Sequence, residues 1–338
     1  MTKYKVGVFS KGFLGADPEL FMTKLGRVVG SEKVIRENKF VVEDGVQVEL
    51  HPDPTYCRDL LLGNLASCIA SLHGMTRGTL AKPSLSVTVD VSKRQYDSLS
   101  DKNKQFGCTP SYNVHSEDHP AMGVDPSKYL KRSAGGHMHF GVQGLPKKEQ
   151  DIIRTPELIV PLFDILVANT CVLLDRDEGN VERRAHYGLA GEYRTPAYGL
   201  EYRTLSNFWL IAPPVASFVF GLARRAIGIA NTDQADELKS LINMDDIRRA
   251  INTNDFDLAL ANYLKYRDFL VGTGAPEDTR FVMSSKSDTD FFGRIVVDGL
   301  EKWFKKDIYA NWLNSKNHYA RGGWTRFKDV VRLEERNK

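Results

Sequence analysis

The heptapeptide Gly135-Gly136-His137-Met138-His139-Phe140-Gly141 alternates two histidines with two apolar residues, between glycines. Successive side chains of an extended strand point to opposite faces of a sheet, so both imidazoles would share one face and Met138 and Phe140 the other. Glycine beside a strand is typical where the backbone comes close to a ligand. The stretch therefore predicts a strand with one buried face and one ligand-binding face.

A second stretch, Gly191 to Arg203, offers complementary groups. Glu201 and Arg203 are two residues apart and would share one face of a strand. Arg194 ends the overlapping segment Glu182 to Arg194, which is dense in arginine, tyrosine and glycine. Carboxylates and imidazoles bind divalent metal ions, and guanidinium groups form forked hydrogen bonds with phosphate. Together the two stretches predict a site for metal ions and a phosphate group.

The composition is that of an ordinary soluble globular protein. The chain has 338 residues, 42% hydrophobic and 26% charged, and its net charge of +3 is too small to argue for nucleic acid binding. Four widely spaced cysteines without a Cys-x-x-Cys pair favour free thiols in a reducing cytoplasm. No apolar run reaches the roughly 20 residues of a membrane span, so we expect a cytoplasmic protein with no membrane partner.

Further carboxylates alternate with apolar residues near the N-terminus. Asp17 and Glu19 are two apart in Phe13–Phe21, although Asp17-Pro18 is also typical of a turn, and Glu49 faces away from its apolar neighbours in Val46–His51. If an antiparallel sheet carried these groups inward with the histidines, it could hold two divalent ions. Oxygen ligands with one imidazole suit Mg²⁺ or Mn²⁺ better than Zn²⁺. The expected metal ligands are Asp17, Glu19, Glu49, His137 and Glu201.

Apolar periodicity predicts the remaining elements. We expect a helix that begins at Pro54 with Asp53 as its cap and ends at Gly74, a strand over 84–91, and an apolar helix over 156–174. We expect a buried strand end followed by a core helix within 208–223. Further helices are expected over 215–230, 233–242, 244–251, 256–270 and 290–303. This pattern divides the chain into a catalytic domain, 1–214, and a helical C-terminal region, 215–338.

The ordered motifs resemble a known family. They are Gly15-Ala16-Asp17-Pro18-Glu19, Val48-Glu49-Leu50, Gly136-His137-Met138-His139 and Leu200-Glu201-Tyr202-Arg203. They look like the carboxylate-amine ligases of the glutamine synthetase and glutamate-cysteine ligase superfamily, and more closely like its phage-type COOH.NH2 ligases (amidoligases). The resemblance covers roughly residues 5 to 215. It implies an α+β fold with an antiparallel glutamine-synthetase-like catalytic sheet packed with helices, plus a mainly helical C-terminal extension, and a phage enzyme working in the host cytoplasm.

The resemblance also implies roles for individual residues. Asp17 would bind one Mg²⁺ ion, and Glu19 with Glu49 would bind the other. His137 and Glu201 match further metal ligands, and His139 matches a residue that reaches the nucleotide phosphates. Arg203 matches the arginine that steadies the γ-phosphate of ATP, and Arg194 would assist it. The family usually has Glu-x-Glu where this chain has Asp17-Pro18-Glu19, so the first ligand is one methylene shorter.

The activity implied is ATP-dependent amide formation. ATP phosphorylates a substrate carboxylate to an acyl phosphate, and an amine then attacks the activated carbonyl. The partners would be a carboxylate and an amine carried by small molecules, peptides or proteins. A general base must deprotonate the amine, and the candidates are Glu192, Glu182 and His115.

Three other functions fit the same residues. An amino-acid ligase could act on nucleobases in DNA hypermodification, supported by the basic and aromatic tail 305–338, which includes Trp312. A hydrolase could use the same two metals with water as the nucleophile. A non-catalytic binding protein could retain a ligase-like sheet. The sequence does not determine the oligomeric state.

Overall fold

The computed structural model describes residues 12–104, 111–116, 130–270 and 300–313. Its strands are β1 Phe13–Ala16, β2 Glu19–Lys24, β3 Arg27–Val29, β4 Val41–Asp44, β5 Gln47–Leu50, β6 Ala81–Ser84, β7 Thr88–Asp90, β8 Tyr112–Asn113, β9 Lys131–Ser133, β10 Met138–Gly141, β11 Glu192–Arg194 and β12 Gly199–Tyr202. Its α-helices are α1 Arg58–Thr76, α2 Lys93–Asp97, α3 Asp101–Lys104, α4 Lys147–Arg154, α5 Pro156–Phe163, α6 Asn169–Val172, α7 Gly179–Arg184, α8 Pro213–Ala230, α9 Gln234–Leu241, α10 Met244–Asn252, α11 Phe256–Leu270, α13 Glu301–Phe304 and α14 Ile308–Leu313. Short 3₁₀ turns lie at η1 Ser31–Lys33 and η3 Asn207–Ile211, and a π-helical turn, η2 Asp164–Ala168, joins α5 to α6.

Two antiparallel sheets carry the predicted site residues. The first has the order β1-β10-β12-β11-β8, and the second has the order β3-β2-β5-β4 with β6 also paired to β2. In the first sheet, His139 is opposite Gly15 on one side and Glu201 on the other, and Arg194 is opposite Glu201. In the second sheet, Glu19 is directly opposite Glu49. Residues paired across strands share a face, so each sheet gathers polar groups on one side.

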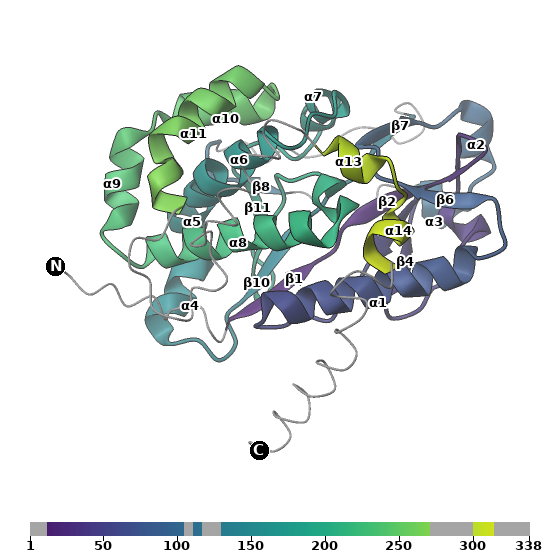
Figure 1. The fold of residues 1–338 in the computed structure, drawn as a ribbon, viewed down its shortest axis with the longest axis horizontal. Coiled ribbons are helices and arrows are strands. Elements are labelled where there is room, and N and C mark those ends of the chain that lie inside the picture. The colour runs from purple at the N-terminus through teal and green to yellow at the C-terminus, as the bar shows by residue number, and fades with distance from the viewer. Residues whose placement is uncertain (1–11, 105–110, 117–129, 271–299, 314–338) are drawn as a thin grey trace, which may run out of the picture.

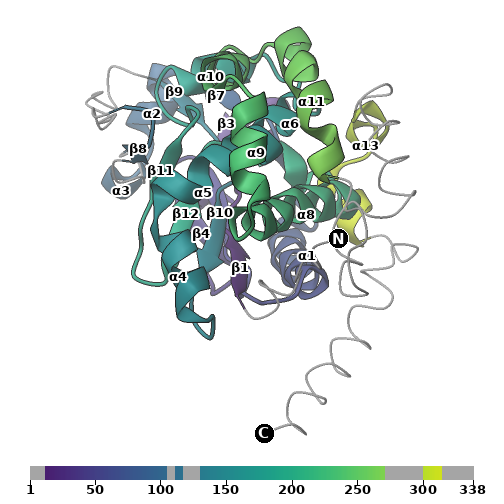
Figure 2. The same cartoon turned by 90° about the vertical axis from the view of Figure 1, so that its left-hand side faces the viewer.

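The opposite face of the first sheet forms the core, as the alternation in 135–141 predicts. Met138, Phe140 and Tyr202 are fully buried there. Phe163 of α5 stacks on Phe140 with ring centroids 4.7 Å apart, and α5 in turn packs on α8. Figure 1 shows α9, α10 and α11 gathered at one end of the molecule, and Figure 2 views it from the side of α4, α5 and α9. Antiparallel sheets packed with helices confirm the α+β class.

One large hydrophobic cluster runs from the N-terminal strands to the last described helix. It joins Leu14 and Phe140 to Val219 of α8 and Trp312 of α14. The indole N–H of Trp312 donates to the carbonyl of Leu210, 2.7 Å away. The division of the chain at 214/215 stays a prediction, and the cluster includes residues from both sides of it.

Three element predictions are wrong, each for a local reason. The first helix begins at Arg58 because Thr55 forms backbone hydrogen bonds with Leu14, which keep residues before the helix extended, and it ends at Thr76. The stretch 84–91 contains only the last residue of β6 and the short strand β7, because the Ser84 hydroxyl accepts from the N–H of Ser86 and interrupts the ladder. The expected strand end near Phe208 is the 3₁₀ turn η3.

The other helix predictions over the described residues are confirmed. The apolar helix over 156–174 is α5, η2 and α6 in succession, and α8 to α11 match the expected ranges to within two residues. The expected helix 290–303 and the tail lie largely outside the described residues. In the part of the chain that is described, no single helix is long and apolar enough to span a membrane; Lys147–Arg154 and Pro156–Val172 pass that test only together, with a bend of 69° between them.

Candidate active site

A first cluster of potential ligands forms on the polar face of the first sheet. One ligand atom each from Asp17, His139 and Glu201 lie within 4.8 Å of one another. His137, two residues before His139, joins them, with Nδ1 3.3 Å from Asp17 Oδ1 and 3.6 Å from Glu201 Oε1. Asp17 reaches the cluster because it follows β1, the strand beside β10. The structure thus brings together four of the residues predicted from sequence.

Two arginines border this first cluster. Nε of Arg203, a nearly completely buried side chain, lies 3.2 Å from Glu201 Oε1, and Nη1 of Arg194 lies 3.5 Å from Glu201 Oε2. Arg194 comes from β11, directly across from Glu201, and Arg203 follows β12. The arrangement sets two guanidinium groups beside a metal-type ligand set, which is the charge pattern that a bound polyphosphate requires.

Several polar atoms of the first cluster lack hydrogen bonds although they are buried. They are Asp17 Oδ1, His137 Nε2, His139 Nε2 and Glu201 Oε1. Asp17 Oδ1 and His139 Nε2 are 2.9 Å apart, but the contact does not have hydrogen-bond geometry. Buried polar atoms without partners cost free energy, and coordination of a cation would satisfy them. The donor set, two carboxylates and imidazole nitrogens, therefore fits a divalent ion such as Mg²⁺ or Mn²⁺.

The second sheet holds a second cluster, composed of Glu19, Asp44 and Glu49, with one oxygen from each within 4.8 Å of the others. Glu19 and Glu49 are cross-strand neighbours, and Asp44 is brought in by the β4–β5 hairpin, in which it pairs with Gln47. Burial, together with the neighbouring carboxylates, raises the pKa of Glu19 well above its usual range and that of Asp44 to about 6. Three carboxylates in contact favour protonation or a bound cation, so this cluster also fits a divalent ion.

The two clusters influence each other electrostatically. Burial would raise the pKa of Asp17, but His139 and His137 hold it well below its ordinary value. Burial would lower the pKa of His139, whereas Asp17, Glu201 and Glu49 raise it. Glu49 belongs to the second cluster and His139 to the first, and Tyr187 contacts both Glu19 and His137, so the two clusters are neighbours.

Backbone geometry fixes Glu19 and explains the glycine pair. The Glu19 Oε2 atom accepts hydrogen bonds from the N–H of Gly135 and from Nε2 of Gln47, both at 2.6 Å. A Cβ at Gly135 would lie 2.4 Å from His137 Nε2, and one at Gly136 would lie 2.3 Å from the carbonyl oxygen of Ser206. The expectation that these glycines admit a ligand is therefore corrected: they admit protein atoms that support the site.

The candidate bases have other partners. Both carboxylate oxygens of Glu192, which is fully buried, accept backbone N–H groups of Gly188 and Leu189. Nε2 of His115 lies 2.8 Å from the buried Asp164, which also accepts from the hydroxyl of Tyr202 on the core side of the sheet. Glu182 forms an ion pair with Lys131. These contacts favour structural roles for Glu192 and His115.

Comparison with known proteins agrees with the geometry of the first sheet. Residues 122–257 match the family model described as phage phiEco32-like COOH.NH2 ligase-type 2. This segment is similar to that family. The match contains the family-like residues His137, His139, Arg194, Glu201 and Arg203, and it confirms the resemblance seen in the motifs.

The comparison with solved structures shows a weak similarity, and the comparison with curated proteins shows none. The chain is similar to a solved structure, the crystal structure of a bifunctional glutathione synthetase from Pasteurella multocida, at 12% sequence identity and a TM-score of 0.40. The alignment covers 94% of this chain and 52% of that one, so the chain spans about half the length of that protein. None of the curated proteins matches the sequence.

Several residues of this candidate site are not predicted from the sequence. Asp44 and Gln47 belong to a hairpin whose register would have placed them beside Glu49, but Glu43-Asp44-Gly45 has the composition of an ordinary turn. Tyr187 contacts Glu19 and His137, and Arg183 contacts Tyr187. Both lie in the segment Glu182 to Arg194, whose arginine, tyrosine and glycine content is notable, but no periodicity distinguishes these two residues within it.

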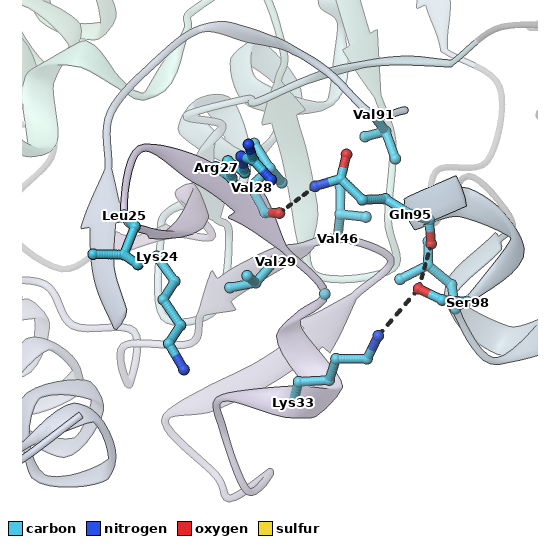
Figure 3. Close-up of a pocket in the computed structure, with 12 residues that line it drawn as sticks. Lys24, Leu25, Arg27, Val28, Val29, Lys33, Val46, Val91, Gln95 and Ser98 are labelled. Carbon is cyan, nitrogen blue, oxygen red and sulfur yellow. Dashed lines mark hydrogen bonds between the residues drawn. The ribbon is translucent and has the colours of Figure 1, made fainter. Parts of the chain in front are cut away.

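A cavity of about 450 Å³ lies away from both clusters. Figure 3 shows Lys24, Arg27 and Lys33 around it, with Gln95 donating to the carbonyl of Val28. No residue of the two carboxylate clusters lines this cavity. The candidate active site is therefore defined by converging side chains on the two sheets and not by this cavity.

Proposed function

We propose that this protein is an ATP-dependent carboxylate-amine ligase that forms an amide bond through an acyl phosphate at a two-magnesium site. The observation that carries the proposal is the convergence of two neighbouring ligand clusters, from two sheets, with Arg194 and Arg203. The family match of residues 122–257 supports the reaction class. The acid and amine would be small molecules, peptides or proteins.

Different residues of the chain would bind the two metal ions and the γ-phosphate. Asp17, His139 and Glu201, with His137 beside them, would hold one ion, and Glu19, Asp44 and Glu49 would hold the other. Bound Mg²⁺ supplies positive charge to the phosphate oxygens and to the group in transfer. Arg203 and Arg194 would bind the γ-phosphate, and the ion pairs that they now form with Glu201 hold their side chains at that position.

The reaction balances in two steps. A carboxylate oxygen of the acid attacks the γ-phosphorus of ATP and ADP leaves, which gives an acyl phosphate. The amine, after loss of a proton, attacks the acyl carbon and inorganic phosphate leaves with the electron pair of the broken C–O bond. Arg203 and Arg194 lower the barrier of the first step by fixing charge beside the transferring group.

The first experiment measures unfolding of the purified protein with ATP, with and without MgCl₂. A ligand at a hundredfold its dissociation constant adds about 2.7 kcal/mol to the free energy of unfolding. We expect a magnesium-dependent stabilisation in the native chain and in Glu237→Gln, a matched change on the exposed side of α9, and none in Glu201→Gln. Equal stabilisation of both variants would place the nucleotide elsewhere and reject the proposed site.

A second experiment separates a ligase from a two-metal hydrolase. The protein is incubated with ATP, MgCl₂ and mixtures of amino acids, and ADP and coupled products are quantified together. A ligase releases ADP in proportion to amide formed, whereas a hydrolase releases it without a coupled product. ADP without amide, unchanged when acids and amines are withdrawn, would contradict the ligase proposal.

A further inference from the structure

Tyr187 lies between the two carboxylate clusters and contacts groups of both. Its hydroxyl donates to Glu19 Oε2 in the second cluster at 3.4 Å. Its ring packs edge-on against the imidazole of His137, beside the first cluster, with ring centroids 6.1 Å apart. The guanidinium carbon of Arg203 lies 5.8 Å from the centre of the same ring. The Tyr187 side chain thus contacts Glu19 of the second sheet and also the imidazole of His137 and the guanidinium group of Arg203, which adjoin strands of the first sheet.

Arg183 also contacts Tyr187. Its guanidinium carbon lies 4.4 Å from the Tyr187 ring centre, so two guanidinium groups lie close to this ring. Arg183 is fully buried, and its Nη atoms donate to the carbonyls of Arg203, Thr204 and Leu205 at 2.8 to 3.1 Å. These three residues follow β12, so Arg183 fixes the backbone that carries Arg203.

The local backbone is shaped around this arginine. Gly188, next to Tyr187, has φ +81°, and a Cβ there would lie 2.2 Å from Arg183 Nη1. No carboxylate in the described part of the chain forms an ion pair with Arg183. Burying the charge of Arg183 costs free energy, because only backbone carbonyls and an aromatic ring face it. A role in positioning its neighbours therefore explains this arginine better than a contribution to stability.

We propose that Tyr187 is a positioning residue that couples the two clusters, and that Arg183 holds it in place. The hydroxyl is a third donor to Glu19 Oε2, beside the Gly135 N–H and Gln47 Nε2, and the ring sets the positions of His137 and Arg203. This inference rests on the two-metal site of the proposed function. We therefore expect that loss of the Tyr187 hydroxyl weakens metal binding at the second cluster alone, whereas loss of the ring also weakens metal binding at the first cluster.

The test measures binding of MnCl₂, followed by the electron paramagnetic resonance signal of free Mn²⁺. Two background variants each keep one cluster intact. Glu201→Gln removes a ligand of the first cluster and keeps the cluster of Glu19, whereas Asp44→Asn removes a ligand of the second cluster and keeps the cluster of Asp17. We expect Tyr187→Phe to weaken Mn²⁺ binding roughly 2- to 10-fold in the Glu201→Gln background, the range of one net hydrogen bond, and to leave the Asp44→Asn background unchanged.

The larger change Tyr187→Leu removes the ring and should weaken Mn²⁺ binding in both backgrounds. Arg183→Lys keeps the charge but loses the forked contacts, so it should act like Tyr187→Leu. The matched control is Tyr266→Phe, which removes a buried hydroxyl whose partners, Asn169 and Thr170, belong to neither cluster. We expect this control to lower the free energy of unfolding without changing Mn²⁺ affinity.

The outcomes are distinct. Tyr187→Phe with native Mn²⁺ affinity in both backgrounds overturns the coupling and leaves the metal site intact. Equal losses in the Tyr187→Phe and Tyr266→Phe proteins assign the effect to stability and also overturn it. A native chain that binds no Mn²⁺ rejects the coupling together with the proposed function. If Tyr187→Leu fails to fold, Tyr187→Phe still decides between these results.

Discussion

Replacement of Gly136 by alanine tests the packing beneath the histidine strand. The new Cβ would lie 2.3 Å from the carbonyl oxygen of Ser206 and 2.5 Å from Nε1 of Trp209. Neither group can turn aside, since one is backbone and Trp209 is fully buried. The strand must therefore move, which would break the bonds from Gly136 N–H to Leu205 and from the Trp209 indole N–H to Gly136.

The magnitude follows from these two effects. Overpacking costs about 1 to 3 kcal/mol, and two lost hydrogen bonds cost about 1 kcal/mol each, so Gly136→Ala should lower the free energy of unfolding by about 3 to 5 kcal/mol. The control is Gly63→Ala within α1, where no atom lies within 4 Å of the new Cβ. Because alanine favours the helix, this variant should gain about 1 kcal/mol.

Urea unfolding, followed by tryptophan fluorescence and circular dichroism, measures both variants. The same change from glycine to alanine should lower the free energy of unfolding at position 136 and raise it at position 63. If the Gly136→Ala protein is as stable as the native chain, Gly136 does not pack closely against Ser206 and Trp209.

Three further predictions concern charge and the core. Without metal, the pKa of Asp44 is raised to about 6 by burial and by Glu49 and Asp17, so its contribution to stability is complete below its ordinary pKa of 3.8 and is lost as the pH rises through 6. Asp44→Asn should flatten the stability profile between pH 4 and 6, and an unchanged slope in urea titrations would contradict this. Asp164→Ala leaves the hydroxyl of Tyr202 and the ring of His115 without their buried partner, and should cost about 1 to 3 kcal/mol in the same assay, against no loss for exposed Asp257→Ala. Trp312→Ala should cost about 3 to 5 kcal/mol, and a loss below 1 kcal/mol would show that α14 is not part of the core.

Much of the first sheet could be predicted from sequence because its alternation is strict. Met138 and Phe140 face the core while His139 faces Glu201, as a period of two requires. The second cluster was predicted only in part. Glu19 and Glu49 were named, but Asp44 reaches them through the register of a hairpin, which a search for short motifs does not examine.

Other features depend on contacts between distant residues. Tyr187 and Arg183 act through a cation-π contact and carbonyls some twenty residues further along the chain, and no local pattern records such pairings. Trp312 has a place that its local sequence does not indicate. It belongs to the basic, aromatic tail, but its ring is fully buried and its indole N–H donates to the carbonyl of Leu210. Residues 314–338 of that tail lie outside the described residues.

The position of α14 has a consequence for the timing of folding during synthesis. Every residue of the two ligand clusters and both arginines has been made once the ribosome passes Arg203, but Trp312 follows about 110 residues later. At cellular elongation rates that interval is roughly 5 to 20 s. During this interval the nascent chain contains every predicted ligand residue. The surface around Leu210 and Ile211, which Trp312 and Asn311 later cover, is still exposed to chaperones. All the ligand residues are therefore made before Trp312 can close the core that packs behind their sheet.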